Sequence, residues 1–143
     1  LMKHPAKLYE ISKLEDRTPT YAKIKDLDLV IIAYDNDISV LYGRCLHRGA
    51  LMSDGHIDGN NLICGVHGWD YRIESGVSEY NNSESLHKFT SKIEDGWIWV
   101  DEQETDDFLK GHPQQRMSYP PFPNDLSNKS NPLGRKLPVM ICG

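Results

Sequence analysis

The stretch Cys45–Trp69, which reads CLHRGALMSDGHIDGNNLICGVHGW, constrains this chain more than any other segment. It contains two of the three cysteines and three of the six histidines. The pairs Cys45-x-His47 and Cys64-x-x-His67 each bring a thiolate and an imidazole within a few residues on a glycine-containing loop, and sixteen residues separate the pairs. Two such loops can enclose a small inorganic centre from opposite sides. The sequence therefore predicts a metal site with four nitrogen and sulfur ligands.

Two cysteines and two histidines are compatible with two kinds of inorganic centre. One is a structural zinc ion with tetrahedral coordination, which would make the chain a binding module in a protein-interaction domain. Common zinc modules, however, pair cysteine with cysteine and histidine with histidine. The other is an iron–sulfur cluster in which one iron takes the two cysteines and the other takes the two histidines. Neutral imidazoles add no negative charge, so such a cluster is easier to reduce than one held by thiolates alone.

The residues around the two pairs resemble the Rieske 2Fe-2S family, in particular its ferredoxin and ring-hydroxylating oxygenase branch. The elements that carry the resemblance are Cys45-x-His47-Arg48-Gly49-Ala50 and Cys64-x-x-His67-Gly68-Trp69-x-Tyr71. A weaker likeness extends over about residues 5–101. The resemblance implies one 2Fe-2S cluster per chain, with Cys45 and Cys64 on an inner iron and His47 and His67 on an outer one.

This likeness implies one-electron transfer, with no catalytic activity expected of the chain itself. The expected roles are a ferredoxin-like carrier or the electron-entry module of a larger redox enzyme, either an oxygenase or a glutamate-synthase-like protein. Its partners would then be redox proteins, namely a reductase, an oxygenase or a flavoenzyme domain. High-potential relatives join the two loops by an extra cysteine pair, whereas this sequence has Ala50 and Val66 there.

The remaining residues near the ligands are expected to tune such a cluster. Tyr71 stands where high-potential members carry a tyrosine whose hydroxyl bonds a ligand sulfur, and Trp69 stands where they carry a serine donor. The missing serine predicts a potential in the lower part of the range from about -150 to +300 mV. Small residues allow backbone N–H groups to approach the sulfides, and they are Gly49, Ala50, Gly65 and Gly68. Three arginines flank the loops and are expected to form local ion pairs: Arg44, Arg48 and Arg72, with Asp54, Asp58 or Asp70.

Residues 1–110 predict an all-β domain, a small antiparallel β-sandwich or open barrel with the two cluster-binding loops at one end. The expected strands are Lys7–Ile11, Tyr21–Lys25, Leu29–Tyr34, Ile38–Tyr42, Trp69–Ile73, Phe89–Ile93 and Trp97–Val100. The Asp95-Gly96 dipeptide is typical of a tight hairpin. Trp97 and Trp99 alternate along one strand and are expected to pack into the core. A short helix is expected over Asp101–Lys110.

The C-terminal part has a different composition. Residues 1–110 hold 12 Lys and Arg against 20 Asp and Glu, a net charge of -8, whereas residues 111–143 hold 4 against 1, a net charge of +3. Six of the eight prolines lie in 111–143, which favours an irregular tail that serves as a linker or a covering arm. The acidic body argues against nucleic acid as a partner.

Cysteine usage and hydropathy give an expectation for the cellular compartment. An odd number of cysteines, with two in the ligand pattern, argues against a disulfide scaffold and favours a reducing compartment. The longest apolar run, Leu29–Tyr34, is far shorter than the roughly 20 residues that span a bilayer. We therefore expect a cytoplasmic chain that is not embedded in a membrane.

Overall fold

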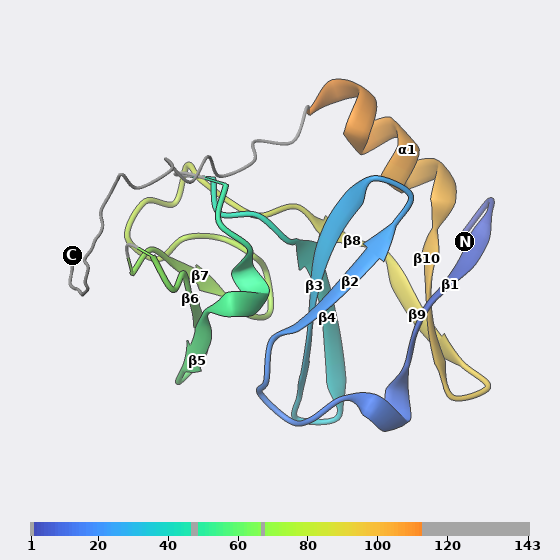
Figure 1. Ribbon diagram of the computed structural model, residues 1–143, viewed down its shortest axis with the longest axis horizontal. Coiled ribbons are helices and arrows are strands. Elements are labelled where there is room, and N and C mark those ends of the chain that lie inside the picture. The colour runs from blue at the N-terminus through green and yellow to red at the C-terminus, as the bar shows by residue number, and fades with distance from the viewer. Residues whose placement is uncertain (1, 47–48, 67, 113–143) are drawn as a thin grey trace, which may run out of the picture.

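The computed structural model describes residues 2–46, 49–66 and 68–112, and the predicted tail 113–143 lies outside this part. Within it, three antiparallel sheets and one helix are formed (Figure 1). The elements are β1 (Pro5–Glu10), η1 (Ile11–Lys13), β2 (Thr20–Ile24), β3 (Leu27–Tyr34), β4 (Asp37–Tyr42), η2 (Met52–Asp54), β5 (His56–Asp58), β6 (Asn61–Ile63), β7 (Asp70–Arg72), β8 (Lys88–Phe89), β9 (Ser91–Glu94), β10 (Trp97–Asp101) and α1 (Glu102–Gly111).

The central sheet has the strand order β2-β3-β4-β8. The apolar run of β3 is buried at every position except Ala33, as expected for a strand covered on both faces. Asp35 and Asn36 form the turn between β3 and β4, with φ angles of 48° and 64°. Positive φ at both central residues matches the right-handed twist of a tight hairpin. The predicted antiparallel meander is confirmed.

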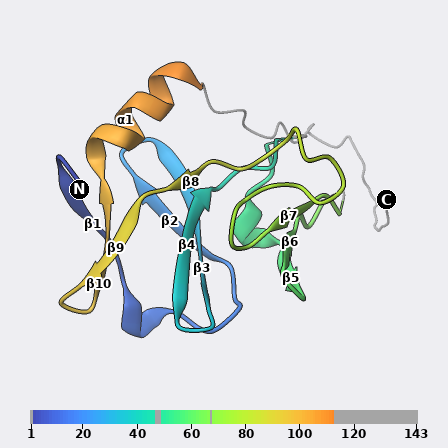
Figure 2. The same ribbon diagram turned by 180° about the vertical axis from the view of Figure 1, so that it is seen from behind.

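The second sheet has the order β1-β10-β9 and packs beside the first (Figure 2). Its hairpin turns at Asp95 and Gly96, whose φ angles are 57° and 79°. β1 contacts β2, and β9 contacts β4, so both outer strands of the second sheet contact the central sheet. The all-β antiparallel prediction is therefore confirmed.

Two predictions about this region were wrong, one about the strand Phe89–Ile93 and one about the tryptophans of β10. The expected strand Phe89–Ile93 is divided between the sheets: Phe89 belongs to β8, which pairs with β4, while β9 pairs with β10. Thr90 lies between them because its backbone N–H donates to Glu104 of α1 at 3.0 Å, not to a neighbouring strand.

The two tryptophans of β10 do share one side of the strand, but it is not the core side. Ile98 and Val100 are fully buried, whereas Trp97 and Trp99 are only partly buried. On the outer face, the Lys7 ammonium lies 5.0 Å from the Trp97 ring centroid and 5.8 Å from that of Trp99. Such contacts are cation–π interactions of the kind found at exposed sites.

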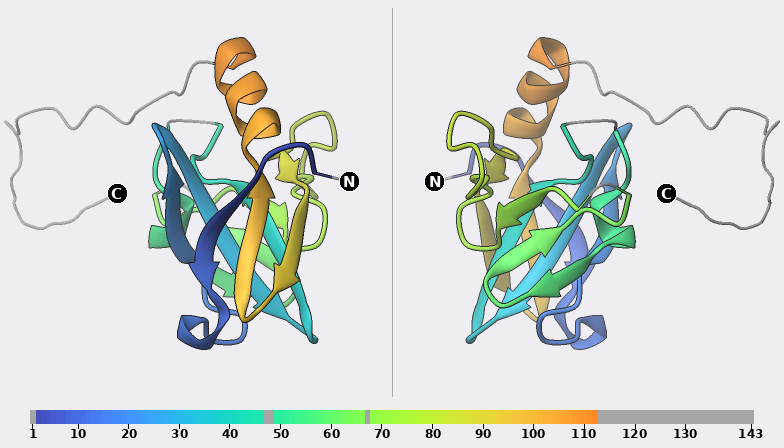
Figure 3. Two further views of the ribbon diagram at one scale, coloured as in Figure 1. Left: turned by 90° about the vertical axis from the view of Figure 1, so that its right-hand side faces the viewer. Right: turned by 90° about the vertical axis from the view of Figure 1, so that its left-hand side faces the viewer.

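The third sheet, β5-β6-β7, lies at one end of the molecule (Figure 3). The second predicted ligand loop joins β6 to β7, and the first follows β4 and precedes η2. The buried side chains of this sheet, Leu62 and Tyr71, belong to the same hydrophobic cluster as the central sheet. Helix α1 forms as predicted, and the Asp101 side chain caps it by accepting a bond from the Gln103 N–H at 3.0 Å. No helix in the described ranges is long and apolar enough to cross a membrane.

Candidate metal centre

The two predicted ligand loops have the same pattern of backbone hydrogen bonds. Each loop spans six residues, 45–50 and 64–69, and has its cysteine first. In the first loop, the Cys45 N–H donates to Ala50 O at 2.8 Å, and the Gly49 N–H donates to Cys45 O at 2.7 Å. In the second loop, the Cys64 N–H donates to Trp69 O at 2.8 Å, and the Gly68 N–H donates to Cys64 O at 3.0 Å. Two sequences with little in common thus form loops with matching hydrogen bonds.

The fifth residue of both loops is a glycine for a conformational reason. Gly49 has φ 78° and Gly68 has φ 72°, in the left-handed region that side chains disfavour. At Gly65 the reason is space: an added Cβ would lie 2.9 Å from the backbone oxygen of Asp54. These glycines therefore have structural roles in addition to the predicted approach of their N–H groups to a cluster.

Cys45 and Cys64 are the two cysteines of the described ranges, and both are buried. Their exposed fractions are only 2% and 3%. Buried thiolates need a neutralising cation, so the pair suits a metal held inside the domain. The predicted ligands His47 and His67, together with Arg48, lie outside the described residues. In the ranges that are described, no group of three or more His, Cys, Asp or Glu side chains is arranged so that it could hold a metal ion.

Tyr71 of β7 places its hydroxyl 3.7 Å from the Cys45 Sγ. The same oxygen accepts a bond from the Leu46 N–H at 3.3 Å, so its own proton is available to donate to the sulfur. Burial raises the pKa of the Tyr71 hydroxyl well above its ordinary value, and the hydrogen bond to Cys45 raises it further. Both effects favour the protonated hydroxyl, which is the form that donates a hydrogen bond.

A buried ion pair ties the first loop to the central sheet. The Arg44 Nε lies 2.8 Å from the Asp28 carboxylate of β3, and the two side chains are 12% and 3% exposed. Arg44 also donates from Nη1 to Gly49 O at 2.7 Å, and the Tyr21 hydroxyl donates to Asp28 at 2.6 Å. The prediction that Arg44 pairs with an acid of the loops was wrong, and sequence reasoning missed Asp28 because nothing in a strand pattern distinguishes it.

Other predicted neighbours have defined positions. Ala50 is buried, Trp69 packs against the core, and Val66 is exposed. Arg72 forms an ion pair at 3.0 Å with Glu79, not with a nearby aspartate.

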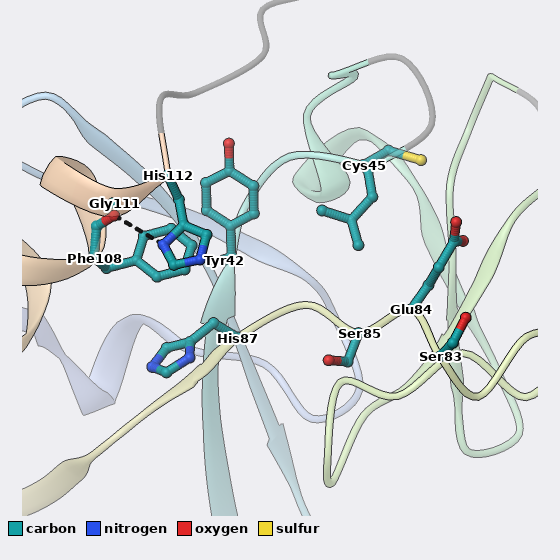
Figure 4. Close-up of a pocket in the computed structure, with 10 residues that line it drawn as sticks. Tyr42, Cys45, Ser83, Glu84, Ser85, His87, Phe108, Gly111 and His112 are labelled. Carbon is teal, nitrogen blue, oxygen red and sulfur yellow. Dashed lines mark hydrogen bonds between the residues drawn. The ribbon is translucent and has the colours of Figure 1, made fainter.

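Two of the histidines outside the ligand pattern, His87 and His112, have local partners. The His87 Nε2 lies 3.0 Å from Glu104, an acid that the sequence did not group with it. The His112 ring stacks on Phe108 with centroids 4.4 Å apart. Both histidines line a cavity of about 610 Å³ that extends from α1 to Cys45 (Figure 4).

Replacing Tyr71 by phenylalanine tests the contact between its hydroxyl and Cys45. We expect Tyr71→Phe to lower the reduction potential of the loaded protein by about 40 mV, since losing a donor worth about 1 kcal/mol disfavours the more anionic reduced state. Protein-film voltammetry measures this shift. Tyr34→Phe is the matched control, because that buried hydroxyl bonds Ser39, and it should leave the potential unchanged. Equal shifts in both variants would contradict the assignment.

Comparison with known proteins identifies a family and one curated relative. The family profile described as "Rieske [2Fe-2S] domain" matches residues 4–90. The methylxanthine N1-demethylase NdmA of Pseudomonas putida is 28% identical over 90 residues, which cover 57% of this chain and 26% of that protein. The chain thus spans about a quarter of the length of this relative.

Solved structures share the fold. The Sphingomonas yanoikuyae B1 ferredoxin has a TM-score of 0.64 at 25% identity, covering 69% of this chain and 99% of that one. NdmA of Pseudomonas putida CBB5 has a TM-score of 0.61 at 24% identity, covering 73% of this chain and 36% of that one. A chain of the complex of reduced oxygenase and oxidized ferredoxin in carbazole 1,9a-dioxygenase has a TM-score of 0.60 at 19% identity. The match covers 68% of this chain and 92% of that one. The likenesses below 25% identity demonstrate a common fold alone.

Proposed function

Because the chain belongs to the Rieske [2Fe-2S] domain family, we propose that its two cysteines hold one iron of the cluster and two histidines hold the other. The proposed ligands are Cys45 and Cys64 for the inner iron, and His47 and His67 for the outer iron. When bound, the cluster accepts and releases one electron. The chain is thus an electron-transfer protein of this family, and the alternative of a structural zinc site gains no support.

The observation that supports these ligands best is the matched pair of loops. Both buried thiols are the first residue of a six-residue loop closed by the same two backbone hydrogen bonds. The hydrogen bonds give each cysteine the same position in its loop. The Tyr71 hydroxyl then supplies a hydrogen bond to one of these sulfurs, which stabilises negative charge there.

The partners follow from the same family and are proteins that give or take electrons. A reductase as donor and an oxygenase or flavoenzyme domain as acceptor are the proposed identities, either as separate proteins or as parts of one larger enzyme. Two apolar side chains of the ligand loops, Leu46 and Val66, are exposed and are suited to such contacts. Cytoplasmic location stays a prediction.

Chemical analysis of the purified chain tests the cluster and its stoichiometry. We expect two irons and two acid-labile sulfides per chain, visible absorption bands, and an electron-spin signal on reduction. A colourless protein that contains one zinc and no sulfide would overturn the proposal and restore the zinc alternative.

We also propose that residues 1–110 form the complete cluster-binding domain and that 111–143 act as a linker. The support is that a ferredoxin is matched over nearly its whole length by this chain, with a third of the chain left over. A chain ending at His112 should therefore keep the iron and sulfide content of the full chain. Loss of the cluster on truncation would instead identify 111–143 as a covering arm.

A further inference from the structure

Glu84 lies in the segment between β7 and β8, and it lines the same cavity as Cys45 and Leu46. Figure 4 shows its carboxylate rising from this segment toward the end of the cavity at which the Cys45 sulfur lies. The cavity has a volume of about 610 Å³. No part of the ligand pattern in the sequence indicates this acid, which lies twenty residues after Cys64.

The backbone holds Glu84 in place from both sides. Its N–H donates to Asn81 O at 3.0 Å, and its carbonyl accepts a bond from the Ser78 N–H at 2.9 Å. The next residue, Ser85, forms an isolated β-bridge with Val77. The Glu84 side chain therefore projects from a folded segment with its main-chain groups already used.

One oxygen of the Glu84 carboxylate is in an unfavourable position. Its Oε1 is buried and has no hydrogen-bond partner among residues 2–46, 49–66 and 68–112. A buried polar oxygen without a donor costs free energy, so the position of this oxygen calls for an explanation.

Glu84 shares its cavity with one of the proposed ligands. Glu84, Cys45 and Leu46 all line this cavity. A negative charge at Glu84 is therefore felt at the Cys45 sulfur, because Coulomb interactions are weakly screened in a partly buried site.

We propose that Glu84 sets the reduction potential, because its negative charge beside Cys45 opposes the arrival of a further negative charge. The step concerned is the addition of one electron, supplied by a redox partner protein, and no bond to Glu84 forms or breaks. The inference rests on the proposed cluster ligation and assigns a tuning residue to it. It gives a second reason, besides the absent serine donor at Trp69, for a low potential.

Voltammetry of charge-removing variants tests this role. Glu84→Gln keeps the size of the side chain and removes its charge. We expect the equilibrium constant for reduction to rise about tenfold, which corresponds to about 59 mV for one electron. Glu84→Asp keeps the charge and should stay within twofold of the natural protein. If Glu84 had only a structural role, both variants would change the equilibrium constant alike. If its charge is what matters, only Glu84→Gln should change it.

Glu74→Gln is the matched control, since it removes the same charge from an exposed turn between the same two strands, and it should change the constant less than twofold. Glu84→Met provides a second neutral variant. If Glu84→Gln or Glu84→Met binds the cluster and keeps the reduction potential of the natural protein, the proposal is overturned. It is also overturned if neither of these two variants binds the cluster. If the natural protein lacks the visible bands and the electron-spin signal, the proposed cluster ligands are contradicted instead.

Discussion

Cys64→Ser is expected to abolish cluster binding. Cys64 is 3% exposed, and its loop is closed by backbone hydrogen bonds that do not involve the side chain. The substitution therefore removes the soft sulfur ligand while the loop keeps its frame, and a hydroxyl oxygen is a poor replacement in an iron–sulfur site. Iron and acid-labile sulfide should fall close to zero, together with the visible absorption bands.

The chain contains its own control for this experiment. Cys142→Ser changes the one cysteine outside the ligand pattern and should leave iron, sulfide and the spectrum unchanged. A Cys64→Ser protein that retains the full iron and sulfide content would rule out Cys64 as a ligand. Loss of the cluster in both variants would show that the assay responds to oxidation or handling and not to ligation.

Asp28→Ala is expected to have the largest effect on folding stability. The Asp28 carboxylate is 3% exposed and compensates the charge of Arg44, which is itself 12% exposed. Removing one partner leaves the guanidinium buried without a counterion, which costs about 3–5 kcal/mol. Urea unfolding followed by tryptophan fluorescence measures the change. Because Arg44 also donates to Gly49 O, we expect the cluster content to fall as well.

Asp35→Asn is the control for this prediction, because it removes the charge while asparagine tolerates the φ angle of 48° at this position. Asp35 follows the same strand and also pairs with an arginine, Arg17, but its side chain is 74% exposed. An exposed pair of this kind is worth about 0–1 kcal/mol, so the variant should be nearly as stable as the natural protein. Equal destabilisation in the two variants would contradict the importance of burial at Asp28.

The strands were predictable because local patterns dictate them. The β-branched run of β3 and the turn residues Asp35 and Asn36 specify a hairpin whatever packs around it. The glycines of the ligand loops were also visible in the sequence, since positive φ at Gly49 and Gly68 is a local requirement.

Which face of a strand is covered is not a local property. The alternation in β10 correctly puts Trp97 and Trp99 on one side, yet only the packing of the sheets decides that Ile98 and Val100 face the core. Similarly, the division of residues 89–93 between two sheets depends on Glu104 of the helix, which lies fourteen residues after Thr90.

The sequence by itself determined the chemistry of the stretch Cys45–Trp69, because the type and spacing of the ligands are properties of one short continuous segment. Only the tertiary structure decided which charges surround it. Asp28 and Glu84 come from a central strand and from a distant loop, and no pattern in either segment distinguishes them from solvated acids. The physical reason is that the interaction between charges depends on distance and burial, and folding alone sets both.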